Sequence, residues 1–170
     1  MIPFRGTAVV RIEATERAGL GRHRRIGFHV SIASGLPRAV ERAVERECTA
    51  LQVFCDNPRA WSWSEHPPEE IERFRRERET AGLSPLVVHA CYLINPCAPD
   101  AGIFRRSVER LARELERSAA LGAEFYVIHP GSPKGRDFAW AIDRAADCLA
   151  HAAQRAESAP PVLLENAAGD

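Results

Sequence analysis

The sequence has no long apolar run, no paired-cysteine motif and no excess of either charge. Nothing in it approaches the roughly 20 apolar residues that span a bilayer, and its N-terminus lacks the apolar core of a signal peptide. We therefore expect a soluble, cytoplasmic protein. The cysteines are odd in number and form no C-x-x-C pair, so neither a disulfide scaffold nor a thiolate zinc knuckle is indicated, and we expect reduced thiols. They are Cys48, Cys55, Cys91, Cys97 and Cys148.

The charge is balanced overall but uneven along the chain. Lys and Arg number 23, as do Asp and Glu, which argues against a protein that coats nucleic acid through a large basic surface. Residues 1–25 carry six arginines and two glutamates, a net +4, so the remainder carries −4. We predict a basic leader over 1–25 and a folded domain over 26–170.

Five short runs rich in Val, Ile, Leu and Phe alternate with four amphipathic stretches. Near-continuous apolar runs of this length are typical of parallel strands covered by helices. The predicted strands are 26–31, 50–55, 85–90, 124–130 and 161–167.

The clearest helix is predicted over 104–122, where apolar residues recur every three or four positions and Gly122 marks the end. Three more helices are predicted over 36–47, 68–82 and from 138 to about 149. The order β-α-β-α-β-α-β-α-β then implies right-handed parallel crossovers.

Two α/β architectures fit this order, a doubly wound open sheet and a β/α barrel. The G-x-G-x-x-G phosphate loop of dinucleotide-binding sheets is missing after the first strand. A complete TIM (β/α) barrel needs roughly 200 residues or more, and this chain has 170. A barrel reading therefore gives a partial TIM barrel of about five parallel strands and four helices, truncated after the fifth strand.

Polar side chains stand at the carboxyl ends of four predicted strands. They are His29, His89, His129 and Glu165. In parallel β/α folds these ends line one face, so residues far apart in sequence converge there. Two imidazoles and a carboxylate on successive strands fit a three-ligand metal site with open positions. The same pattern could hold a general base, and the ligand set also suits manganese or iron.

Five motifs in order resemble the endonuclease IV family, zinc-dependent apurinic/apyrimidinic endonucleases on a xylose isomerase-like barrel. They are "GFHVS" with "SGL", "VFCDNPRAW", "HACYLIN", "IHPGS" and "LLENAAG", and they span 27–169. The resemblance implies that His89 and His129 are zinc ligands. It implies that Glu165 is the catalytic glutamate that bridges two of the family's three zinc ions. The present chain would hold ligands for about one of them.

The resemblance also assigns residues that contact DNA. Tyr92 and Leu93 would enter the duplex at the lesion, and Arg59 would help fill the gap in the base stack. Apolar wedges cost unstacking energy, and an abasic site makes that cost smaller. Asp56 lies where the family usually has a basic or neutral residue, and an acid placed as in the family would face phosphate.

The implied activity is hydrolysis of the phosphodiester 5′ to abasic sites in double-stranded DNA, within base-excision repair. We expect this chain alone to be largely inactive, and to self-associate through uncovered strand edges. A metal-dependent sugar isomerase or epimerase of the same superfamily, or an inactive remnant, are the alternatives. The combination of Arg59 with Tyr92 and Leu93 favours the nuclease, because a small sugar does not require a loop that wedges a base stack.

Overall fold

The computed structural model describes residues 24–166, in which four strands and four helices alternate. The predicted basic leader lies almost entirely outside the described residues, as do the last four residues of the chain. The elements are α1 (Leu36–Glu45), β1 (Leu51–Phe54), α2 (Pro68–Thr80), β2 (Leu86–His89), α3 (Ala101–Ala120), β3 (Phe125–Ile128), α4 (Phe138–Arg155) and β4 (Val162–Leu164).

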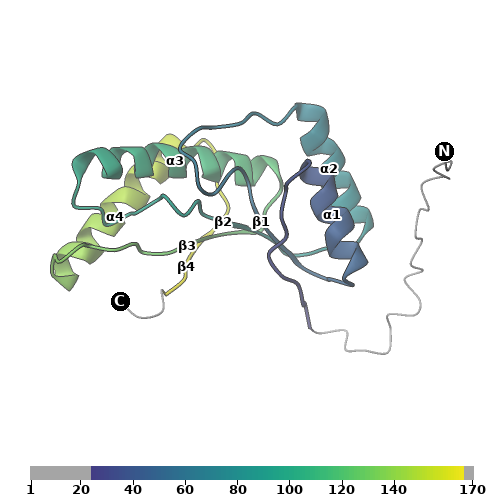
Figure 1. Cartoon of the computed structure of the whole chain (residues 1–170), viewed down its shortest axis with the longest axis horizontal. Coiled ribbons are helices and arrows are strands. Elements are labelled where there is room, and N and C mark those ends of the chain that lie inside the picture. Colours follow the sequence, from purple (N-terminus) through teal and green to yellow (C-terminus); the bar gives the residue numbers. More distant parts are fainter. Residues whose placement is uncertain (1–23, 167–170) are drawn as a thin grey trace, which may run out of the picture.

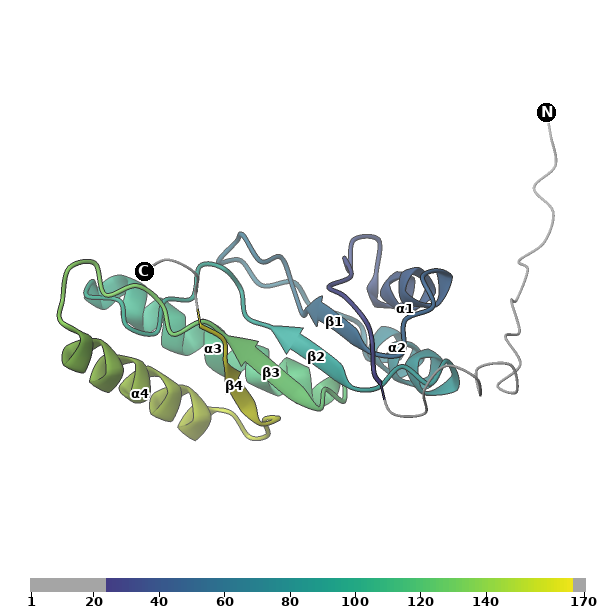
Figure 2. The same cartoon turned by 90° about the horizontal axis from the view of Figure 1, so that it is seen from below.

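The strands form one parallel sheet in the order β1-β2-β3-β4, as the alternating pattern predicts. The helices lie on one side of this sheet, with α1 and α2 beside β1 and α3 and α4 over the other end (Figure 1). Seen from below, the strands stand in front of α2 and α3, and no helix covers them from this side (Figure 2). This is the arrangement of part of a β/α barrel.

The first predicted strand, 26–31, is not a regular strand. It runs alongside β1 but makes a single parallel bridge, between His29 and Gln52. The hydrogen bonds are from Val30 N–H to the Gln52 carbonyl and from Gln52 N–H to the Phe28 carbonyl. Before the bridge, a Cβ at Gly27 would lie 2.1 Å from the Ala50 carbonyl oxygen. The backbones therefore approach closely at Gly27. On its other side the Ile26 carbonyl accepts from the N–H groups of Thr49 and Ala50, so the segment is hydrogen-bonded along β1 without forming a regular strand.

The two faces of the sheet differ in burial because side chains alternate along each strand. The helix-covered face carries side chains that are at most 1% exposed, namely Leu51, Val53, Leu86, Val88, Tyr126 and Ile128. The opposite face carries half-buried residues, among them Phe54, Val87, Phe125 and Val127. The core therefore lies between sheet and helices, and the other face is open.

Both α3 and α4 begin at an aspartate that caps the helix. The Asp100 carboxylate accepts from Ile103 N–H at 2.8 Å, and the Asp137 carboxylate accepts from Trp140 N–H at 2.9 Å. Such caps satisfy backbone donors that the first turn leaves free. None of the helices in the described part of the chain is long and apolar enough to cross a membrane.

Among residues 24–166, β4 is the last strand of the sheet. All three of its residues are exposed, with Leu164 at 61%. On the neighbouring α4, Phe138 and Ile142 are exposed as well.

Candidate functional site

The candidate site is formed where β2, β3 and β4 end. His89 is the last residue of β2, while His129 and Glu165 directly follow β3 and β4. The register pairs His89 with Val127, and Val127 with Leu163. His129 and Glu165 therefore stand level with each other, two residues beyond His89. Strand stagger of this kind is expected from the tilt of strands in a barrel.

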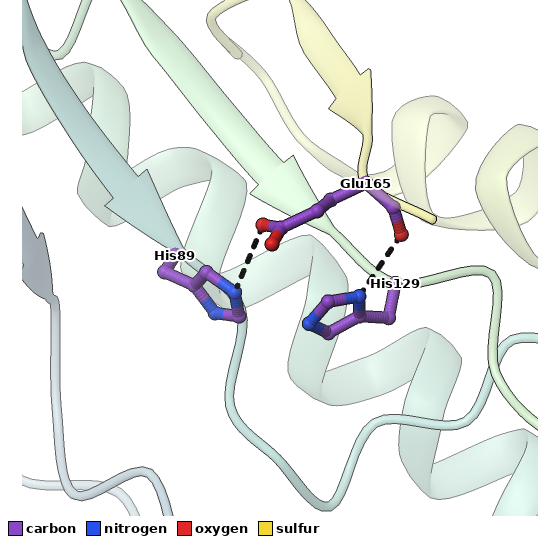
Figure 3. Close-up of side chains that lie close together, drawn as sticks. All are labelled: His89, His129 and Glu165. Atoms are coloured by element: carbon purple, nitrogen blue, oxygen red, sulfur yellow. Dashed lines mark hydrogen bonds and ion pairs between the residues drawn. The ribbon is translucent and has the colours of Figure 1, made fainter. Parts of the chain in front are cut away.

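The three side chains point toward one another (Figure 3). One potential ligand atom from each of His89, His129 and Glu165 lies within 4.8 Å of the other two. His89 Nε2 is 3.6 Å from Glu165 Oε2, and the two imidazole rings have their centroids 5.2 Å apart. Within residues 24–166 this is the one group of three such side chains whose donor atoms converge in this way.

Backbone carbonyls fix the orientation of both imidazoles. His89 Nδ1 donates to the Ala90 carbonyl at 2.9 Å, and His129 Nδ1 donates to the Glu165 carbonyl at 2.9 Å. A carbonyl can only accept, so in the neutral rings the proton is on Nδ1 and the lone pair is on Nε2. Metal-binding histidines are commonly held by such an outer hydrogen bond. On each ring, Nε2 is therefore the nitrogen that could hold a metal ion.

His29, the fourth strand-end candidate, does not join this group. Its ring lies 6.0 Å from that of His89 and packs against Phe54. The Gln52 amide nitrogen donates to His29 Nδ1 at 2.9 Å, so the ring proton is on Nε2, the opposite arrangement to His89 and His129. Burial, together with the neighbouring His89, lowers the pKa of His29 to about 4. The ring is therefore neutral at physiological pH and presents no free lone pair.

The residues that the family resemblance assigns to DNA lie on neighbouring loops beside these strand ends. Arg59 is exposed, and Tyr92 is 59% exposed. Tyr92 N–H donates to the carbonyl of Pro58, the residue before Arg59, at 3.0 Å. Leu93 is half-buried against the core. The side chains of Arg59 and Tyr92 are therefore exposed on adjacent backbone, and that of Leu93 is only partly exposed.

Asp56 does not face outward, and the expectation that its acid would face phosphate is wrong. Its side chain is 5% exposed and accepts from the N–H groups of Asn57 and Ser64. It also lies 3.3 Å from the guanidinium of Arg110, which comes from α3. The negative charge is therefore paired inside the protein.

A cavity of about 290 Å³ opens beside His89 and His129, between the loops that follow β2 and β3. Asn95 joins these loops, since its amide donates to the Ser132 carbonyl and its oxygen accepts from Ser132 N–H. A Cβ at Gly131 would lie 2.1 Å from Asn95 Oδ1. The sequence reasoning missed Asn95, although a glycine directly after "HP" was a signal of close approach. A larger hollow, about 680 Å³, lies between α1 and α2, and none of His89, His129 and Glu165 lines it.

Comparison with known proteins gives a family match and several relatives. A family model described as xylose isomerase-like TIM barrel matches residues 40–170. A probable endonuclease 4 of Halothermothrix orenii is 38% identical over 145 residues, which are 85% of this chain and 52% of that protein. The crystal structure of endonuclease IV from Thermus thermophilus superposes with a TM-score of 0.77 at 40% identity, covering 86% of this chain and 53% of that one.

A more distant structure shares the fold. A D-tagatose 3-epimerase-like protein superposes with a TM-score of 0.62 at 22% identity, over 85% of this chain and 54% of its own. The chain thus spans about half the length of the curated relatives it matches.

Proposed function

Because the chain belongs to the xylose isomerase-like TIM barrel family, we propose that it forms part of a metal-dependent DNA endonuclease of the endonuclease IV type. The proposed reaction is hydrolysis of the phosphodiester 5′ to an abasic site, in base-excision repair. The observation that carries the proposal is the convergence of His89, His129 and Glu165 at three successive strand ends. Relatives named endonuclease 4 support a nuclease in particular.

The proposed metal is zinc. Two imidazole nitrogens and one carboxylate oxygen are a ligand set that catalytic zinc sites use, with positions left open for water or substrate. The Nδ1–H bonds of both histidines to carbonyls support this, since they leave Nε2 free on each ring. A zinc ion supplies Lewis acidity, which polarises a phosphate oxygen and lowers the pKa of water. Glu165 is the proposed catalytic carboxylate as well as a ligand.

The proposed DNA contacts are Arg59, Tyr92 and Leu93. An exposed tyrosine at the rim of a strand-end site is suited to stacking or wedging beside a missing base. Arg59 would meet the same stretch of duplex, because the Tyr92–Pro58 hydrogen bond sets the two side chains on adjacent backbone. Leu93, half-buried, would contribute only its exposed part unless the loop moves.

We further propose that residues 1–170 alone hydrolyse DNA slowly or not at all. Residues 24–166 offer ligands for one metal ion, whereas phosphodiester hydrolysis by metal clusters stabilises both the attacking and the leaving oxygen. We also propose that the chain self-associates, through the exposed edge of β4. A reducing compartment, the cytoplasm, fits the five cysteines, which are all free and buried.

The test is binding of the zinc-loaded chain to two duplexes that differ only by one abasic-site analogue, followed by fluorescence anisotropy. We expect tighter binding to the abasic duplex, and loss of that preference in Arg59→Ala and Tyr92→Ala. Arg76→Ala is the matched control, because Arg76 is an exposed arginine on α2. Equal affinity for both duplexes in the wild type would contradict the proposal, and zinc uptake without any DNA preference would favour the sugar-epimerase alternative.

A further inference from the structure

The two loops that carry the proposed DNA contacts are bonded to each other. The β1 loop (55–67) carries Arg59, and the β2 loop (90–100) carries Tyr92. Besides the Tyr92 N–H bond, the Cys91 thiol lies 3.1 Å from the Pro58 carbonyl. Both contacts reach the residue that precedes Arg59. Displacement of the β2 loop at Cys91 and Tyr92 would therefore act on the β1 loop at Pro58.

A buried carboxylate of α3, Glu114, holds the β2 loop from below. Glu114 is 1% exposed. Its Oε2 accepts from Cys91 N–H at 3.1 Å and from the Tyr126 hydroxyl at 2.7 Å, and its Oε1 accepts from Arg110 Nε at 2.7 Å. Cys91, whose backbone N–H donates to Glu114, directly precedes Tyr92.

Arg110, one turn earlier on α3, holds the β1 loop. Its Nη1 donates to the Ser62 carbonyl at 2.8 Å and lies 3.3 Å from Asp56 Oδ2, and its Nη2 donates to the Asn57 carbonyl at 3.4 Å. These partners lie on both sides of Arg59. The guanidinium has fixed donor directions, so it sets the position of the β1 loop and also pairs with the charge of Asp56.

Arg117 completes the set at the far end of the β1 loop. Its Nη1 donates to the Ser64 carbonyl at 2.6 Å, and its guanidinium lies 4.0 Å from the ring centre of Trp63. Arg110 lies over the same ring at 4.7 Å. Trp63 therefore packs against two arginines of α3, which fixes the end of the loop to the helix. We call Arg110, Glu114 and Arg117 together the α3 clamp.

We propose that the α3 clamp consists of positioning residues that set Arg59 and Tyr92 relative to the His89, His129 and Glu165 site. This inference rests on the proposed function. Buried ion pairs contribute little net stability, because desolvation offsets much of their attraction, so an apolar layer would serve stability equally well. What directional charged groups add is a defined loop geometry. None of the three clamp residues is among the converging metal-binding side chains.

The clamp can be tested first without DNA, by amide hydrogen exchange of the zinc-loaded chain. Glu114→Gln keeps the shape of the side chain but replaces one carboxylate oxygen, which accepts hydrogen bonds, by an NH₂ group. This group would face the donors of Cys91, Tyr126 or Arg110. We expect exchange in both the β1 and the β2 loop to rise about tenfold or more, as local opening becomes easier. Arg117→Met, the milder variant, should loosen the β1 loop only. Glu116→Gln, an exposed glutamate on α3, is the control.

Zinc stoichiometry and the affinity ratio of abasic to intact duplex are then measured on the same variants. We expect Glu114→Gln to retain zinc and to lose the abasic preference, a combination that a general loss of folding would not produce. Unchanged exchange in the loops of Glu114→Gln, or loosening of the β1 and β2 loops together in Arg117→Met, would overturn the clamp. An unselective wild type would refute the proposed function, while the exchange result would still decide the clamp.

Discussion

Replacing Tyr126 by phenylalanine should destabilise the fold by removing one donor to a buried carboxylate. Tyr126 is fully buried on β3, and its hydroxyl donates to Glu114 Oε2 at 2.7 Å. A hydrogen bond to a charged group contributes about 1.5 to 3 kcal/mol. The carboxylate keeps its bonds from Cys91 and Arg110, so the loss should lie near the lower end, about 1.5 kcal/mol. For a chain of this size that corresponds to a melting temperature lower by roughly 3 to 6 °C.

The measurement is urea unfolding of both proteins at neutral pH, with the transition followed by circular dichroism. Tyr92→Phe is the matched control, since Tyr92 is exposed. Removal of its hydroxyl should change the free energy of unfolding by no more than about 0.5 kcal/mol. An unfolding free energy for Tyr126→Phe equal to that of wild type would refute the reasoning. It would mean that Glu114 does not need the tyrosine as a partner.

Three other variants test the loops, the acid response and the open edge. Gly131→Ala should lose at least about 1 kcal/mol of stability, because φ is +92° and the new methyl would meet Asn95; an unchanged melting curve would contradict this. Burial raises the pKa of Glu124, but hydrogen bonds from Leu86 N–H and Arg78 outweigh it and hold that pKa below 4.5. The carboxylate therefore stabilises the fold above pH 4.5 and loses this effect as the pH falls. In Glu124→Gln, the urea midpoint should therefore decrease less between neutral and acidic pH than it does in the wild type. An equal decrease in both proteins would contradict this prediction. Leu164→Lys should reduce self-association, measured by sedimentation velocity. An unchanged distribution of sedimentation coefficients would show that the chains do not associate through the β4 edge.

The sequence predicts the strand ends well because a buried parallel strand is a short apolar run that is easily recognised. In each case a short apolar run leads to a polar residue, which is the last residue of β2 and the first residue after β3 and β4. That pattern was enough to anticipate the convergence of His89, His129 and Glu165, which the fold then produces. The start of α3 was predicted three residues late, because the prediction followed apolar spacing and overlooked the Asp100 cap.

What the sequence could not show depends on partners that only folding supplies. From the sequence, Asp56 is expected to be an acid on a loop, whereas the structure pairs it with Arg110 of α3. His29 reads as a strand-end ligand like His89, yet the amide of Gln52 reverses its tautomer. In both cases the environment of the side chain is set by a partner from another segment, which the sequence around the residue does not reveal.

Metal content is the most direct test of the central claim that His89, His129 and Glu165 form a metal site. The chain is purified with zinc, dialysed and analysed by mass spectrometry under native conditions, alongside His89→Ala with His129→Ala. His151→Ala is the control, since His151 is exposed on α4. We predict close to one zinc ion per chain in the wild type and the control, and its loss in the double variant. Equal zinc in all three proteins, or none in the wild type, would contradict the account.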